Sequence, residues 1–226
     1  QSDFDKLVKT SKFSNEEIQF KKNFLNNFIK KGFPNRKQED WKFLDISQII
    51  KKNISDLSFF NDYSQSNRID PSIFVDGLEH NKIIFINGRI EKIDFNFEDQ
   101  NKIEIIDETK KDISFDYENS LIDLNSAFTD KVFKILIKKN YSLKKPLIIY
   151  HSINDETKST NINLRLDFEL GENSCLKLID YFANTAAKNF INIFYNFNLE
   201  KDSILKNYKI DKFRNNNLKY SFNNIE

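Results

Sequence analysis

The chain has 226 residues, enough for one large domain or two small ones with a hydrophobic core that needs no disulfides or metals. Its 35 basic and 34 acidic residues nearly cancel, which argues against a nucleic-acid partner. One cysteine excludes an internal disulfide and any cysteine-rich zinc or iron–sulfur site built by this chain alone. No apolar run reaches the ~18 residues of a membrane span, and no signal peptide is recognisable, so we expect a cytoplasmic protein without a membrane partner.

Lysine, asparagine and isoleucine occur 30 times each. All three have AT-rich codons, so genome bias explains the asparagine content, and we predict no prion-like tract. The 23 phenylalanines and 8 tyrosines argue against disorder. The chain lacks methionine and begins at Gln1, from which we expect a fragment of a longer protein.

Residues 1–58 are predicted to form an α-helical N-terminal region. Ser14 and Glu17 have the spacing of a capping box, which marks the start of a helix. Gly32 and Pro34 follow the apolar stripe of that helix and are expected to end it.

Residues 59–120 are predicted to be a mixed segment. Asn87 and Gly88 separate two apolar runs, which indicates a β-hairpin because both central positions of its turn need a positive φ angle. Residues 94–120 are interpreted as an irregular, solvated acidic loop. Its acidic residues include Asp107, Glu108, Asp112, Asp116 and Glu118.

Residues 121–226 open on a possible helical turn and then alternate apolar and polar residues, the period of β-strands. The stretch 168–177 aligns with 197–206 at an offset of 29 residues, and an earlier stretch fits at an offset of 33. A repeat of this length built from strands and turns is typical of a stacked β-solenoid. We therefore predict a mainly β fold: the first, incomplete coils of a right-handed parallel β-helix, truncated at the C-terminus. An antiparallel β-sandwich is the alternative.

The motifs of common catalytic sites are missing: no phosphate-binding glycine loop, nucleophile elbow or His-Glu-x-x-His zinc motif occurs. His80 and His151 are interpreted as solvent-facing residues. Cys175 occupies the repeat position of Ile204, so it is interpreted as a small apolar residue in the wall of the fold. We predict no catalytic, cofactor-binding or metal-binding residue. The acidic residues of the repeat are scattered: Asp167, Glu169, Glu172 and Asp180.

One segment carries a motif that indicates a particular protein family, which the composition alone does not. Residues 32–43, Gly-Phe-Pro-Asn-Arg-Lys-Gln-Glu-Asp-Trp-Lys-Phe, resemble the N-terminal signature of the SufB/SufD family of iron–sulfur cluster assembly proteins, and the short distance to the Trp-Lys pair favours the SufD branch. The stretches 85–88, 124–130 and 145–147 are also similar to that family. The chain departs from the family pattern at Phe43 and Leu44, where Tyr-Thr is more usual.

The resemblance implies a non-enzymatic scaffold subunit of the Suf complex, with SufB and the ATPase SufC as partners. It implies an iron–sulfur cluster and ATP only at the level of that complex, with no cofactor bound by this chain alone. The family's surface for SufC lies in a C-terminal domain, so we expect weak SufC binding here. Trp41 and Arg36 are candidate partner contacts, although we favour Trp41 as the anchor of the helices on the strands.

Three other functions stay open at this stage: a SufB-like paralogue, a β-helix carbohydrate-active enzyme and a β-solenoid binding module. Residues 191–199 and 204–210 are expected to be the last strands. Their open edges and apolar face predict self-association or fraying.

Overall fold

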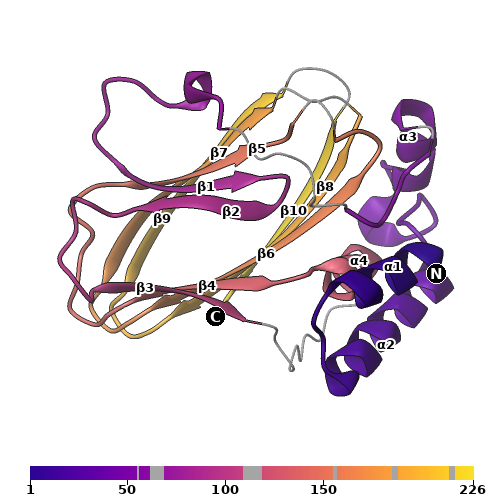
Figure 1. The fold of residues 1–226 in the computed structure, drawn as a ribbon, viewed down its shortest axis with the longest axis horizontal. Helices are drawn as coiled ribbons and strands as arrows, with labels where there is room; N and C mark the ends of the chain where they lie inside the picture. The colour runs from indigo at the N-terminus through magenta and orange to yellow at the C-terminus, as the bar shows by residue number, and fades with distance from the viewer. Residues whose placement is uncertain (55, 62–68, 109–118, 155–156, 185–187, 214–216) are drawn as a thin grey trace.

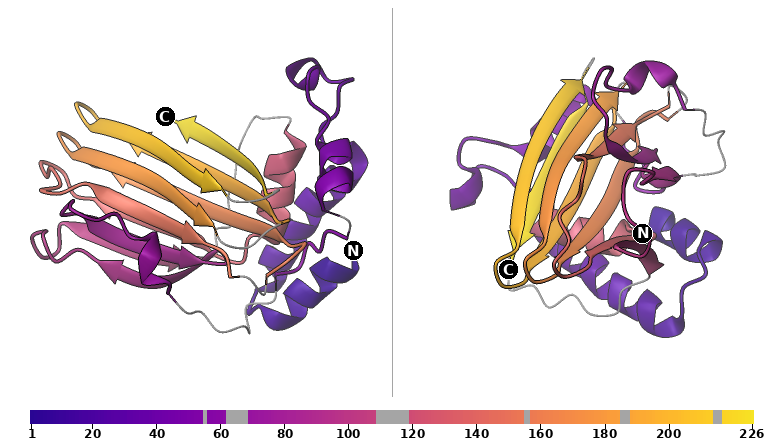
Figure 2. Two further views of the ribbon diagram at one scale, coloured as in Figure 1. Left: turned by 90° about the horizontal axis from the view of Figure 1, so that it is seen from above. Right: turned by 90° about the vertical axis from the view of Figure 1, so that its left-hand side faces the viewer.

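In the residues that the structure describes, ten strands form two sheets of five, and four α-helices gather at one end of the sheets (Figure 1). The computed structural model describes residues 1–54, 56–61, 69–108, 119–154, 157–184, 188–213 and 217–226. The two sheets lie face to face as layers, as the two views of Figure 2 show.

The first sheet has the order β2-β1-β5-β7-β9. Only its β1–β2 hairpin is antiparallel; the other neighbours pair in parallel. Its strands are β1 (Asn81–Ile86), β2 (Arg89–Asp94), β5 (Leu147–Ser152), β7 (Cys175–Asn184) and β9 (Ile204–Phe213).

The second sheet has the order β10-β8-β6-β4-β3. Here only β3 is antiparallel to its neighbour. Its strands are β3 (Ile103–Glu108), β4 (Val132–Ile137), β6 (Asn161–Leu170), β8 (Phe190–Leu199) and β10 (Leu218–Ile225). From β4 to β10, consecutive strands therefore alternate between the two sheets.

The expected mainly β fold, a right-handed parallel β-helix, is wrong. The described chain is an α/β fold with two mixed, mostly parallel sheets and four helices. The repeat itself has a physical counterpart, because Phe168 pairs with Phe197 and Cys175 with Ile204 at the predicted offset of 29. An offset specifies which residues lie side by side within a sheet. It carries no information about the antiparallel edge strands or the helices, and these decide the fold class.

Strand β3 shows where the sequence pattern was too weak. Its residues lie in the segment interpreted as an irregular acidic loop, and that interpretation is wrong for Ile103–Glu108. Ile103 and Ile105 face Ile137 and Ile135 across the ladder, with the charged Glu104 between them. Asp112, Asp116 and Glu118 lie outside the described residues.

The main core fills the space between the two sheets. It contains the inward side chains of both sheets, among them Phe85, Ile149, Leu178, Phe168 and Tyr195. A second cluster joins the helices to the end of the second sheet, and Phe190 of β8 belongs to it. A third, smaller cluster covers the outer face of the first sheet.

The helices are α1 (Ser2–Thr10), α2 (Asn15–Lys31), α3 (Ile46–Asn53) and α4 (Ser120–Phe128), with short 3-10 turns at Glu39–Trp41 and Pro71–Ile73. The capping box is confirmed: the Ser14 hydroxyl accepts the Glu17 amide at 3.2 Å, and the Glu17 carboxylate accepts the Ser14 amide at 2.6 Å. Gly32 ends α2 with a φ of +69°. The hairpin is also confirmed, because Asn87 and Gly88 both have positive φ angles.

Helix α4 links the helices to the second sheet. The Asn125 amide donates to the carbonyls of Leu164 and Asn192, at 3.1 and 2.8 Å. At the C-terminal end of α4, the buried Lys21 ammonium of α2 donates to carbonyls of residues 126 and 129. Burial lowers the pKa of Lys21 to about 8. A cation at this end of a helix is favourable because the helix dipole is negative there.

The close stacking at the end of β6 predicts the effect of Gly171→Ala. An added Cβ would lie 2.6 Å from the Lys139 backbone nitrogen, so the two turns must separate. We expect a loss of about 1–3 kcal/mol in the free energy of unfolding, the usual cost of overpacking. Urea denaturation measures it. Lys201→Ala, at an exposed turn, is the control and should change stability by less than about 0.5 kcal/mol. Equal stability of Gly171→Ala and the parent chain would show that Gly171 and Lys139 are not in close contact.

Candidate functional site

His151 is buried, so its interpretation as a solvent-facing residue is wrong. It is 6 % exposed, and its Nε2 lies 2.7 Å from Oδ1 of Asp180, which is fully buried. His151 continues the inward series of Leu147 and Ile149 on β5, and Asp180 follows Leu178 on β7. Both residues therefore point into the main core. The sequence contained a sign of this burial, because both polar residues occupy positions of the period-2 pattern that apolar residues otherwise fill.

The imidazole of His151 is held between two aromatic rings. The His151 and Phe182 rings stack with centroids 4.1 Å apart and planes 6° apart, and Phe85 stacks on the other side at 5.4 Å. The three residues come from neighbouring strands in register, with Phe85 opposite His151 and His151 opposite Phe182. The ladder itself therefore builds the stack.

Tyr195 connects the pair of His151 and Asp180 to the second sheet. The Tyr195 hydroxyl, from β8, lies 3.5 Å from the same His151 nitrogen. Burial raises the pKa of Asp180, but His151, the Tyr195 hydroxyl and the Lys209 charge together outweigh it, and the pKa lies below its ordinary value. Burial and the nearby Asp180 carboxylate raise the pKa of Tyr195 well above its ordinary value. We call these three residues the inter-sheet cluster.

His80 is also buried rather than solvent-facing. Its Nδ1 lies 2.6 Å from the Leu78 carbonyl and its Nε2 lies 2.8 Å from the Tyr150 hydroxyl. Because a carbonyl only accepts, Nδ1 carries a proton and donates it to Leu78, and Nε2 shares a hydrogen bond with the Tyr150 hydroxyl. Tyr150 in turn accepts the Val75 amide at 3.1 Å. This chain of hydrogen bonds fastens the segment before β1 to the outer face of the first sheet.

Neither histidine lies where a substrate could reach it. Every member of the inter-sheet cluster is at most 6 % exposed, and aromatic rings enclose it. Among the residues that the structure describes, no group of three or more histidine, cysteine or acidic side chains is placed to hold a metal ion. The geometry of these buried groups therefore favours a structural role.

The acidic residues of the repeat do not come together either. Asp180 belongs to the inter-sheet cluster, and Asp167 bonds Nε of the buried Arg165 at 3.1 Å. Glu169 forms an ion pair with Lys134, and Glu172 lies exposed in a turn. These carboxylates face different partners, so they do not form the paired acids that glycoside hydrolysis needs.

Cys175 is more accessible than its interpretation as a wall residue implies. It begins β7 with intermediate exposure and pairs with Ile204, which is 51 % exposed. The repeat equivalence is confirmed, but both positions face outward, Cys175 on the inner strand β7 and Ile204 on the edge strand β9.

The motif at residues 32–43 forms the turn between α2 and α3. The ring of Trp41 lies 5.8 Å from the ring of Tyr220 on β10, and Trp41 packs on the helical cluster, as an anchoring role predicts. Arg36 is exposed. Phe43 is 86 % exposed, which makes it the most exposed large apolar residue among those described.

Strands β9 and β10 form the edge at one end of the two layers (Figure 2). The apolar face expected at this edge is only partly present. Between the layers the two strands carry polar groups: Lys209 donates to Asn223 at 3.0 Å, and Lys219 pairs with Asp211. The outer face of β9 carries its exposed apolar residues, Ile204, Tyr208 and Ile210. We call the exposed sides of β9 and β10 the C-terminal edge.

No protein-family model matches this chain, and no curated protein matches it at a significant level. In the described part of the chain, no helix is both long and apolar enough to cross a membrane.

The buried carboxylate predicts a defined pH dependence. The pKa of Asp180 is lowered in the folded state, so its contribution to stability is present above the unfolded pKa of about 3.9 and is lost as the pH falls through the folded value. Asp180→Asn should lower the free energy of unfolding by about 3–5 kcal/mol at pH 7, because it breaks the buried pair with His151. Urea denaturation between pH 2 and 7 should show a flatter profile for the variant. Parallel profiles would rule out this role for Asp180.

Because Trp41 contacts Tyr220, we expect Trp41→Ala to lower the free energy of unfolding by about 3 kcal/mol. This value is at the lower end of the range for large aromatic residues, since the side chain is only partly buried. Phe43→Ala is the matched control, since its exposed ring should contribute less than about 0.5 kcal/mol. Denaturant titrations of both variants measure the difference. Equal losses would show that Trp41 does not anchor the helices.

Proposed function

We propose that this chain is a non-catalytic scaffold subunit of the Suf iron–sulfur cluster assembly complex, working in the cytoplasm, with SufB as its direct partner. The proposal rests first on the resemblance of residues 32–43 and of the later stretches to the SufB/SufD family. In this role the chain holds a partner in position. ATP hydrolysis by SufC and the iron–sulfur cluster are then properties of the assembled complex and not of this chain alone.

The observation that carries the proposal is the C-terminal edge. Along β9 and β10, backbone groups on one side have no neighbouring strand among the described residues. Such an edge accepts a strand from another protein through main-chain hydrogen bonds, and side-chain contacts supply specificity. Ile204, Tyr208 and Ile210 supply exposed apolar area beside it.

The charge of β9 indicates what kind of strand fits. It has three lysines, Lys206, Lys209 and Lys212, against the single acid Asp211. Lysines on an edge disfavour pairing between like copies and favour an acidic partner strand. The resemblance motif is connected to this edge, because Trp41 contacts Tyr220 on β10.

Co-expression with SufB and SufC from the same source tests the proposal. We expect a complex with SufB that survives size-exclusion chromatography with light scattering. The chain should show no ATP hydrolysis by itself. Absence of a SufB complex would overturn the proposal, and pairing with SufD instead would identify the chain as SufB-like.

A pair of matched variants tests the docking surface. Ile210 on β9 and Ile106 on β3 are both 41 % exposed. Ile210→Asp should weaken SufB binding at least tenfold, because it places a charge in the apolar contact, while Ile106→Asp should leave binding unchanged. Titration calorimetry with purified SufB gives both affinities. An unchanged affinity for Ile210→Asp would show that SufB binds elsewhere.

A further inference from the structure

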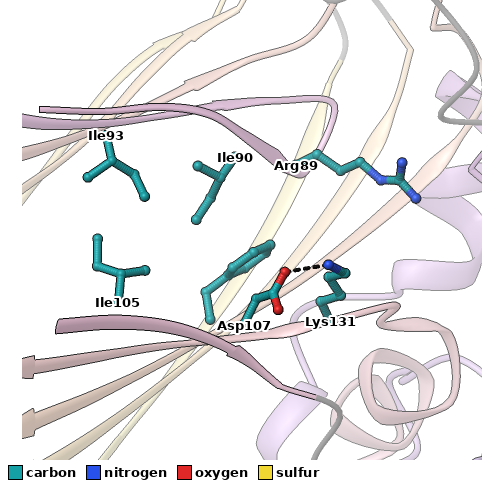
Figure 3. A pocket seen from close by; sticks show the side chains of 7 residues that line it. Arg89, Ile90, Ile93, Ile105, Asp107 and Lys131 are labelled. Atoms are coloured by element: carbon teal, nitrogen blue, oxygen red, sulfur yellow. Dashed lines mark hydrogen bonds and ion pairs between the residues drawn. The ribbon is translucent and has the colours of Figure 1, made fainter. Parts of the chain in front are cut away.

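A pocket of about 490 Å³ opens between β2 and β3, the edge strands at the opposite end of the two layers (Figure 3). Ile90 and Ile93 line it from β2, and Ile105 lines it from β3. Phe133 forms part of its wall. The pocket opens to solvent, and its volume falls in the range of ligand sites.

A β-bulge creates the apolar wall of the pocket. Across the β1–β2 ladder, Ile84 pairs with Lys92 but Phe85 pairs with Ile90, so Glu91 is an extra residue. Residues three apart on a regular strand point to opposite faces. The bulge shifts this phase, and Ile90 and Ile93 both turn toward the pocket (Figure 3). Bulges are common next to binding sites for this reason.

The opposite end of the pocket is charged. Arg89, Lys131 and Asp107 lie there, away from Ile93 and Ile105 (Figure 3). Lys131 forms an ion pair with Asp107, and Arg89 forms one with Asp130 at 3.1 Å. Lys131 and Asp107 are both about half exposed, and an ion pair of this kind contributes little stability, so Lys131 can turn toward a bound anion. Arg89 is also about half exposed, while its partner Asp130 is 15 % exposed.

We propose that this pocket binds a single-chain amphipathic carboxylate. Its apolar tail lies between Ile93 and Ile105, and its carboxylate is held by Arg89 and Lys131. Arg89 and Lys131 are the two cations of the lining, and each faces one acid, Asp130 or Asp107, so a bound carboxylate takes the place of one of these acids as their partner. The four residue steps from Arg89 to Ile93 span at most about 13 Å at ~3.3 Å each, since the bulge shortens the strand, and this length accommodates a medium-length acyl chain.

Titration calorimetry with octanoate tests the proposal on the purified chain. We expect saturable binding with one octanoate per chain, below the concentration at which octanoate forms micelles. Octyltrimethylammonium, with the same tail and the opposite charge, and butyrate, with the same head and a short tail, should each bind at least tenfold more weakly. Equal binding of either compound would overturn the proposal.

Variants locate the binding. Ile93→Asp should weaken octanoate binding at least tenfold, while Ile204→Asp, at a similarly exposed position on the distant β9, should have no effect. Arg89→Gln tests the head-group contact with less risk to folding, because its side chain is 45 % exposed, and circular dichroism checks each variant. The proposal fails if octanoate binds Ile93→Asp and Arg89→Gln as it binds the parent chain. It also fails if the chain binds only phosphatidylglycerol vesicles and not free octanoate.

Discussion

The structure depends on one apolar interior shared by two facing sheets. Neither sheet can bury its inward side chains alone. Each strand alternates apolar and polar residues, so every strand must turn its apolar residues toward the other sheet. The fixed offset between paired strands follows from this requirement: a slip of one residue would turn Phe168 and its neighbours outward. The turns must also stack closely, which leaves no space for a side chain at Gly171.

The asparagines have structural roles that codon bias does not account for. Asn87, Asn101, Asn140 and Asn173 have positive φ angles, which asparagine tolerates better than most residues. Elsewhere asparagine side chains satisfy backbone groups between strands. The side chain of Asn189, for example, accepts the Thr160 amide at 3.0 Å and donates to the Thr157 carbonyl at 2.8 Å. A biased composition thus supplied the residues that a turn-rich, stacked fold requires.

The two ends of the layers differ physically. At one end, β2 and β3 are antiparallel strands, and a bulge in β2 leaves a pocket with a charged rim. At the other end, β9 and β10 are parallel to their neighbours and carry lysines and exposed apolar residues. We propose a small amphipathic ligand at the first end and a protein strand at the second. These two proposals concern separate surfaces, so each can fail without affecting the other.

Local sequence patterns correctly predicted the elements that neighbouring residues determine. The capping box at Ser14, the glycine that ends α2, the Asn87-Gly88 hairpin and the 29-residue offset all follow from the chemistry of neighbouring or repeating residues. The class of the fold and strand β3 did not follow, because they depend on which distant segments complete each sheet. The burial of His151 and Asp180 was also decided by tertiary structure. The alternation placed both residues in the phase of the apolar residues, but a polar side chain is stable there only because the opposite sheet excludes water and a partner forms its hydrogen bond.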